Sequence, residues 1–87
     1  MIITYVVSYA YRDGTPGISH FSAKQWADFG KQPVPYFEEK VKTYKADNEG
    51  YPTGISIDRC IITGDAVTEI YNVFKWDRKN GAKSRRA

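Results

Sequence analysis

The sequence predicts an α+β fold: a two-layer sandwich whose four-stranded antiparallel sheet carries one broken helical segment on one face. Two observations lead to this prediction. Apolar residues alternate with period two near both ends of the chain, and they recur every three or four residues in the middle. Strands that are neighbours in sequence usually pair, so the order ββ-αα-ββ implies an antiparallel sheet with helices covering one face.

The chain opens with a predicted hairpin. Residues 2 to 12 are rich in β-branched and aromatic residues and contain no Gly or Pro, which favours a strand. The segment Asp13-Gly14-Thr15-Pro16-Gly17 can reverse the chain, and residues 18 to 21 are expected to return as a short strand.

Two helices are expected next. Ser22 and Gln25 fit a capping box at the start of a short helix that Gly30 can close. Pro33 and Pro35 prevent this helix from continuing, and a second, amphipathic helix is expected over about residues 35 to 47.

A second hairpin is predicted after a loop over residues 47 to 54. Its strands cover residues 55 to 63 and 67 to 76, and Gly64 and Asp65 form the turn between them. We therefore expect residues 1 to 76 to form a single α+β domain.

The basic charge is concentrated at the C-terminal end. Residues 77 to 87 contain five basic residues and one acidic residue, so they carry +4, and the other 76 residues carry −1 of the total of +3. We expect residues 77 to 87 to form a disordered basic tail.

Composition excludes several classes of protein. No run of about 18 apolar residues exists, so no membrane span is expected, and the first residues do not resemble a signal peptide. With Cys60 as the only cysteine, no internal disulfide can form, and a cytoplasmic protein is expected. His20 is the only histidine, so neither a metal site nor a catalytic set is predicted, and no cofactor motif is present.

Tyrosine is the most informative excess, with seven in 87 residues. Three of them share one face of the first strand and are called the tyrosine row: Tyr5, Tyr9 and Tyr11. This row either packs under the helices or lies on the face that the helices leave open, where aromatic side chains anchor a partner. The second interpretation gives a candidate partner-binding set of Tyr5, Tyr9, Tyr11, Arg12 and Tyr51.

The layout of residues 1 to 76 resembles small accessory proteins that bacteriophages encode. The resemblance lies in the opening residues 3 to 9, the early Asp13-Gly14 hairpin and the late strand over residues 72 to 76. Such proteins often inhibit host enzymes or host defence systems, anti-CRISPR proteins among them. The group shares size and style rather than a site, so the resemblance assigns no functional residue.

Three functions follow as hypotheses. The first is a non-enzymatic, phage-type inhibitor that binds a bacterial host or defence protein through its aromatic sheet face. The alternative is a nucleic-acid-binding module that uses aromatic side chains together with the basic residues Arg78, Lys79, Lys83, Arg85 and Arg86. The third is a small enzyme or nucleotide-sequestering protein with a pocket between the protomers of a homodimer.

Overall fold

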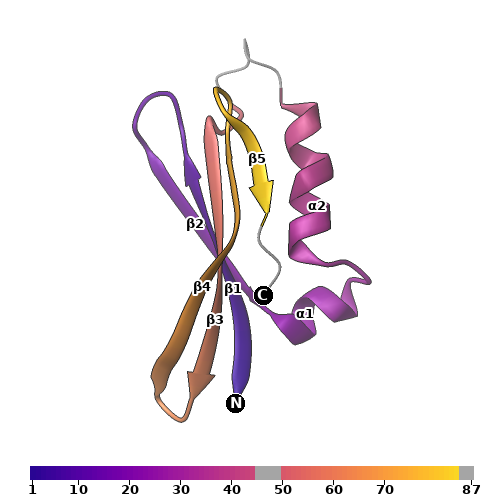
Figure 1. The fold of residues 1–87 in the computed structure, drawn as a ribbon, viewed down its shortest axis with the longest axis vertical. Coiled ribbons are helices and arrows are strands. Elements are labelled where there is room, and N and C mark those ends of the chain that lie inside the picture. Colours follow the sequence, from indigo (N-terminus) through magenta and orange to yellow (C-terminus); the bar gives the residue numbers. More distant parts are fainter. Residues whose placement is uncertain (45–49, 85–87) are drawn as a thin grey trace.

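The computed structural model describes residues 1–44 and 50–84, with side chains through Gly81. The chain forms an α+β fold of two layers, with an open antiparallel sheet on one side and two short helices on the other (Figure 1). The elements follow the order β1 (Ile2–Ala10), β2 (Pro16–Ser22), α1 (Ala23–Asp28), α2 (Pro33–Lys40), a 3₁₀ turn (Val41–Thr43), β3 (Gly54–Thr63), β4 (Ala66–Asp77) and β5 (Gly81–Ser84). The predicted fold class is confirmed.

The sheet has the strand order β2-β1-β3-β4-β5, with antiparallel pairing throughout. Both predicted hairpins are present, and the chain passes from the first to the second by way of the helices. This arrangement places the two longest pairings, β1 with β3 and β3 with β4, at the centre of the sheet.

The core lies between the sheet and the helices. Val7, Ile57 and Phe74 occupy one cross-strand row of the sheet and are completely buried. Trp26 of α1 and Phe37 of α2 belong to the same core, with their ring centroids 6.3 Å apart. Burial of a side chain as large as Phe74 contributes about 3 kcal/mol to folding, so this row holds the two layers together.

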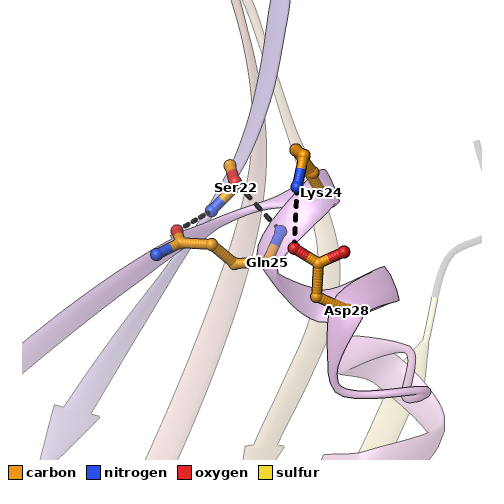
Figure 2. Close-up of polar contacts among 4 residues, drawn as sticks. All are labelled: Ser22, Lys24, Gln25 and Asp28. Atoms are coloured by element: carbon orange, nitrogen blue, oxygen red, sulfur yellow. Dashed lines mark hydrogen bonds and ion pairs between the residues drawn. The ribbon is translucent and has the colours of Figure 1, made fainter.

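A capping box starts α1, as the sequence predicts. The Ser22 hydroxyl accepts a hydrogen bond from the Gln25 backbone N–H at 3.1 Å, and the Gln25 side-chain oxygen accepts one from the Ser22 N–H at 2.8 Å (Figure 2). Gly30 follows the helix with a φ of +69°, a left-handed conformation that favours glycine. The chain can therefore turn directly from the edge strand β2 back over the sheet.

The second helix differs from its predicted bounds. It begins at Pro33 rather than Pro35 and changes to a 3₁₀ turn at Val41, and residues 45 to 47 of the expected helix lie outside the described residues. Proline suits the first turn of a helix because its missing N–H would have no partner there. The helix therefore starts two residues earlier than the apolar spacing suggested.

The sheet has a fifth strand that the sequence analysis did not predict. Residues 81 to 84 pair with residues 74 to 77 of β4, so the prediction that residues 77 to 87 are disordered is wrong for this part. The Asp77 carboxylate accepts hydrogen bonds from the backbone N–H groups of Lys79 and Asn80 at 3.0 and 2.7 Å, and Gly81 has a φ of +76°. This local turn reverses the chain, and basic composition alone does not reveal it.

Strand β4 contains two irregularities in its register with β3, next to Ile57 and next to Ile61. At the first, both Val73 and Phe74 become buried, although alternation would place them on opposite faces. The period-two alternation that the sequence analysis assigned to this end of the chain therefore does not hold along the whole of β4.

The capping box gives a direct test of the layout. Replacing Ser22 with Ala should lower the free energy of unfolding by about 1 kcal/mol, because the Gln25 backbone N–H loses its acceptor. Urea denaturation followed by tryptophan fluorescence measures this change. In the same helix, Lys24 forms an exposed ion pair with Asp28 at 2.9 Å (Figure 2). Lys24→Ala should cost about 0.5 kcal/mol or less, and an equal loss in both variants would contradict a specific role for the cap.

Candidate functional site

Two residues of the tyrosine row, Tyr5 and Tyr9, lie under the helices and not on the face that the helices leave open. Tyr5 and Tyr9 are partly buried against the core, and the Tyr9 ring lies 6.3 Å from the Phe37 ring of α2. The expectation of an exposed aromatic sheet face is therefore wrong. The helices cover this face because Val7, between the two tyrosines in the alternation, belongs to the apolar row that they bury.

The other residues of the predicted partner-binding set are spread over one end of the sheet. Tyr11 is half-buried and stacks on Tyr9 with ring centroids 6.5 Å apart. Arg12 is exposed, and Tyr51 stacks on Tyr44 at 5.0 Å. A role for these residues in partner binding stays a prediction. The exposed aromatic sheet face that it assumed is not present.

The face opposite the helices, called the open face, is covered by no described element (Figure 1). Residues that pair across strands share a face, and Ile2, Ile62 and Val67 form one such row at the end of the sheet. Cys60 and Ile70 belong to the next row. On β1 and β3 these residues have the opposite parity to Val7 and Ile57. On β4 the register irregularities beside Ile57 and Ile61 place Ile70 opposite Cys60 and Val67 opposite Ile62, so all of them lie on the open face.

Large apolar side chains on the open face are strongly exposed. The exposed fractions are 57% for Ile2, 54% for Val67 and 63% for Ile70, and Ile62 beside them is half-buried. We call these four residues the isoleucine-valine patch. Ile18, which is 72% exposed, lies on the same face at the edge strand β2.

Polar groups beside this patch bond to each other. The Asn72 side-chain amide donates to Ser56 Oγ at 2.8 Å and to the Asp58 carboxylate at 3.0 Å. Asp58 and Asn72 are cross-strand partners, so this polar network borders the patch on the same face. The Asn72 amide is therefore engaged within the protein, and the four patch residues themselves offer apolar contact.

A cavity of about 400 Å³ lies on the other side, where α1, α2 and the 3₁₀ turn meet the β1–β2 end of the sheet. Its aromatic lining includes Tyr9, Phe21, Trp26, Phe29, Tyr36 and Phe37. Its polar lining comprises Ser19, Lys31 and Lys40, together with the phenol groups of its tyrosines. The Ser19 hydroxyl and the Tyr9 phenol are hydrogen-bonded at 3.2 Å.

Tyr44 also lines the cavity and packs against Trp76 with ring centroids 5.7 Å apart. Burial raises the pKa of Tyr44 to about 12, and the neighbouring phenols of Tyr9 and Tyr36 add to this effect. The phenol therefore stays neutral over the physiological pH range.

The single cysteine and the single histidine of the chain are not brought together. Cys60 is buried, and burial together with nearby Asp58 raises the pKa of its thiol. His20 is exposed on the edge strand β2, opposite Val6, whereas Cys60 lies on β3 beyond β1. Within residues 1–44 and 50–81, no group of three or more His, Cys, Asp or Glu side chains could hold a metal ion.

The basic residues proposed for nucleic acid binding do not form one described surface. Arg78 is half-buried and donates to the Pro52 carbonyl at 3.3 Å, so its side chain bridges two loops of the fold. Lys79 lies in the β4–β5 turn, and the backbone of Lys83 pairs with Lys75. Arg85 and Arg86, and the side chain of Lys83, lie outside the described residues.

No family model matches this chain, and no curated protein or solved structure is significantly similar to it. In the part of the chain that the structure describes, no helix is long and apolar enough to cross a membrane.

Sequence reasoning missed both features. The residues of the isoleucine-valine patch come from three strands, and the sequence does not indicate which face of these strands the helices cover. The sequence signal was partial. Alternation groups Ile2 with Val6 on one face of the first strand, whereas Val67 and Ile70 differ in parity and reach the same face only through the register irregularity beside Ile61. The cavity depends on how two helices and a sheet edge meet, which has no local sequence signal.

The state of Cys60 leads to a prediction about its reactivity. In the folded protein, the raised pKa and the burial of the thiol should make its reaction with a thiol-specific reagent at pH 8 at least about tenfold slower than in urea, because the thiolate is the reactive form. The absorbance of the released chromophore measures both rates. Equal rates with and without urea would show that Cys60 is accessible.

The raised pKa of Tyr44 leads to a prediction about alkaline stability. The pKa is about 12 in the folded protein and near 10.0 without its surroundings, so above pH 10 the unfolded chain releases a proton that the folded protein retains. The contribution of the Tyr44 phenol to the free energy of unfolding is fully present below pH 10 and is lost as the pH rises towards 12. Tyr44→Phe should therefore lose less stability between pH 9 and about 11.5 than the unmodified protein.

Urea midpoints at several pH values measure this difference. Tyr5→Phe is the control, because it removes one phenol from the same face of the sheet. An identical alkaline loss in Tyr44→Phe and the unmodified protein would contradict the role of Tyr44.

Proposed function

We propose that this protein is a non-enzymatic binding protein that occupies the surface of another protein through its open face. The observation that carries the proposal is the isoleucine-valine patch, in which three large apolar side chains are more than half exposed on a sheet face without a covering layer. Scattered exposed apolar residues are ordinary, whereas neighbouring ones on one face characterise protein interaction sites.

The chemistry of the patch defines the partner. Of the polar side chains that border the patch, Asp58 and Asn72 are hydrogen-bonded to each other, and Thr4, opposite Cys60, donates to the Phe21 carbonyl at 3.2 Å. The four patch residues offer no cation to a phosphate backbone, and Lys75, the lysine of β4 on this face, lies opposite Ser56, beyond the Asp58–Asn72 pair. A protein surface with an apolar centre fits better, because contact would remove Ile2, Val67 and Ile70 from water at about 25 cal/mol for each Å² of apolar surface buried.

The resemblance to phage-encoded accessory proteins supports a narrower proposal. The partner would be a host or defence protein in the bacterial cytoplasm, a CRISPR protein among the candidates, and binding would inhibit it by blocking its surface. The near-neutral charge of residues 1 to 76 suits recognition by shape and apolar contact.

The nucleic-acid alternative stays a prediction for the basic C-terminal residues. Of its five residues, Arg78 already donates a hydrogen bond within the fold. No specific observation on the described residues favours this alternative over protein binding.

Substitution on the open face tests the proposal. Ile70→Lys places a charge in the patch and should weaken partner binding at least about tenfold, because a buried unpaired charge is strongly unfavourable in an apolar interface. Tyr71→Lys is the matched control, since Tyr71 is the next residue of β4, is also exposed, and lies opposite Arg59 on the other face.

The measurement begins with capture from a bacterial lysate by each tagged variant and continues with reconstitution from the purified partner. Support requires a complex of defined stoichiometry that forms with the unmodified protein and with Tyr71→Lys but not with Ile70→Lys. Equal binding by all three would refute the site. Light scattering that shows a homodimer broken by Ile70→Lys would make the open face a self-association surface and overturn the proposal.

A further inference from the structure

We propose that the cavity between the helices and the β1–β2 end of the sheet binds a small aromatic molecule that carries an anionic group. The cavity volume of about 400 Å³ falls within the range of small-molecule sites. It is lined from the helix-covered side of the sheet, so this inference does not depend on binding at the open face.

The walls of the cavity suit a planar ring. The Trp26 ring lies 5.6 Å from that of Tyr36 and 5.9 Å from that of Phe21, and the Tyr36 and Phe37 rings meet edge to face at 5.0 Å. Phe29 lines the same cavity and is 66% exposed. A flat aromatic ligand could contact these rings and cover exposed apolar surface.

One polar group in the wall has no partner. Trp26 is only 7% exposed, and its indole N–H is buried without a hydrogen-bond acceptor. A buried donor left unpaired is costly, so the proposed ligand carries an acceptor atom that reaches this N–H. This feature selects a ligand with an oxygen or nitrogen acceptor rather than a pure hydrocarbon.

The charges of the cavity select an anion. The ammonium groups of Lys31 and Lys40 lie 5.1 and 5.8 Å from the centre of the Tyr36 ring. Among the described residues, neither forms an ion pair, whereas Lys24 of α1 and Lys42 of the 3₁₀ turn each bind a carboxylate at 2.9 Å. Two cations without a carboxylate partner, beside an aromatic wall, complement a ring that bears a phosphate or a carboxylate.

Heteronuclear NMR of the full chain provides the first test. The protein has two tryptophans, so two indole N–H signals are expected, with Trp76 as a reference for Trp26. Two aromatic anions, adenosine monophosphate and indoleacetate, are titrated beside their neutral counterparts, adenosine and indole, and beside inorganic phosphate. We expect at least one aromatic anion to bind more tightly than its neutral counterpart and to shift the Trp26 signal downfield.

A charge-matched pair of variants provides the second test. The double variant Lys31→Gln, Lys40→Gln should weaken binding of the aromatic anion by up to about fivefold for each lysine. The double variant Lys24→Gln, Lys42→Gln removes the same charge from the same region without touching the cavity and should leave binding unchanged. Ile70→Lys should also leave it unchanged, which separates this inference from the proposed function.

Three outcomes would overturn the inference. The first is that neither aromatic anion perturbs the Trp26 signal. The second is that the neutral counterparts bind as tightly as the anions. The third is that both lysine pairs weaken binding equally, which would indicate attraction to overall charge rather than to Lys31 and Lys40.

Discussion

The packing of Trp26 and Phe37 onto the buried row Val7, Ile57 and Phe74 is the contact on which the rest of the structure depends. This row crosses the three central strands, so helices seated on it cover the middle of one sheet face. Because two layers can bury only one face of the sheet, the choice of this face also decides what the other face exposes. Tyr5 and Tyr9 therefore pack beneath the helices, and the isoleucine-valine patch is exposed on the opposite face.

The two candidate sites follow from that division and differ in chemistry. On the open face, the polar neighbours Asp58 and Asn72 bond to each other, and apolar contact remains. In the cavity, Lys31, Lys40 and the indole N–H of Trp26 lack acidic or accepting partners among the described residues. A small protein can thus present an apolar docking face and a cationic aromatic cavity, because the sheet separates them.

Local features were well predicted from the sequence. The capping box at Ser22 and Gln25 and the turn at Gly64 each depend on a few neighbouring residues, and both occur as expected. Longer-range features were not. The irregular register beside Val73 depends on how β4 pairs with β3. Strand β5 depends on the turn that the Asp77 carboxylate stabilises, which brings the chain back alongside β4. The irregularity and the fifth strand each require pairing with a particular neighbouring strand, and composition does not identify that neighbour.

The sequence by itself determined the α+β class, the two hairpins and the helical segment between them, since apolar period and turn residues act over short distances. Only the tertiary structure decided that Tyr5 and Tyr9 lie under the helices while Ile2, Val67 and Ile70 face outwards. Both faces of β1 carry apolar residues, so alternation defines the two faces without saying which one is covered. That choice depends on the combined fit of Trp26, Phe37 and the three buried strand residues, which exists only once all of them are brought together.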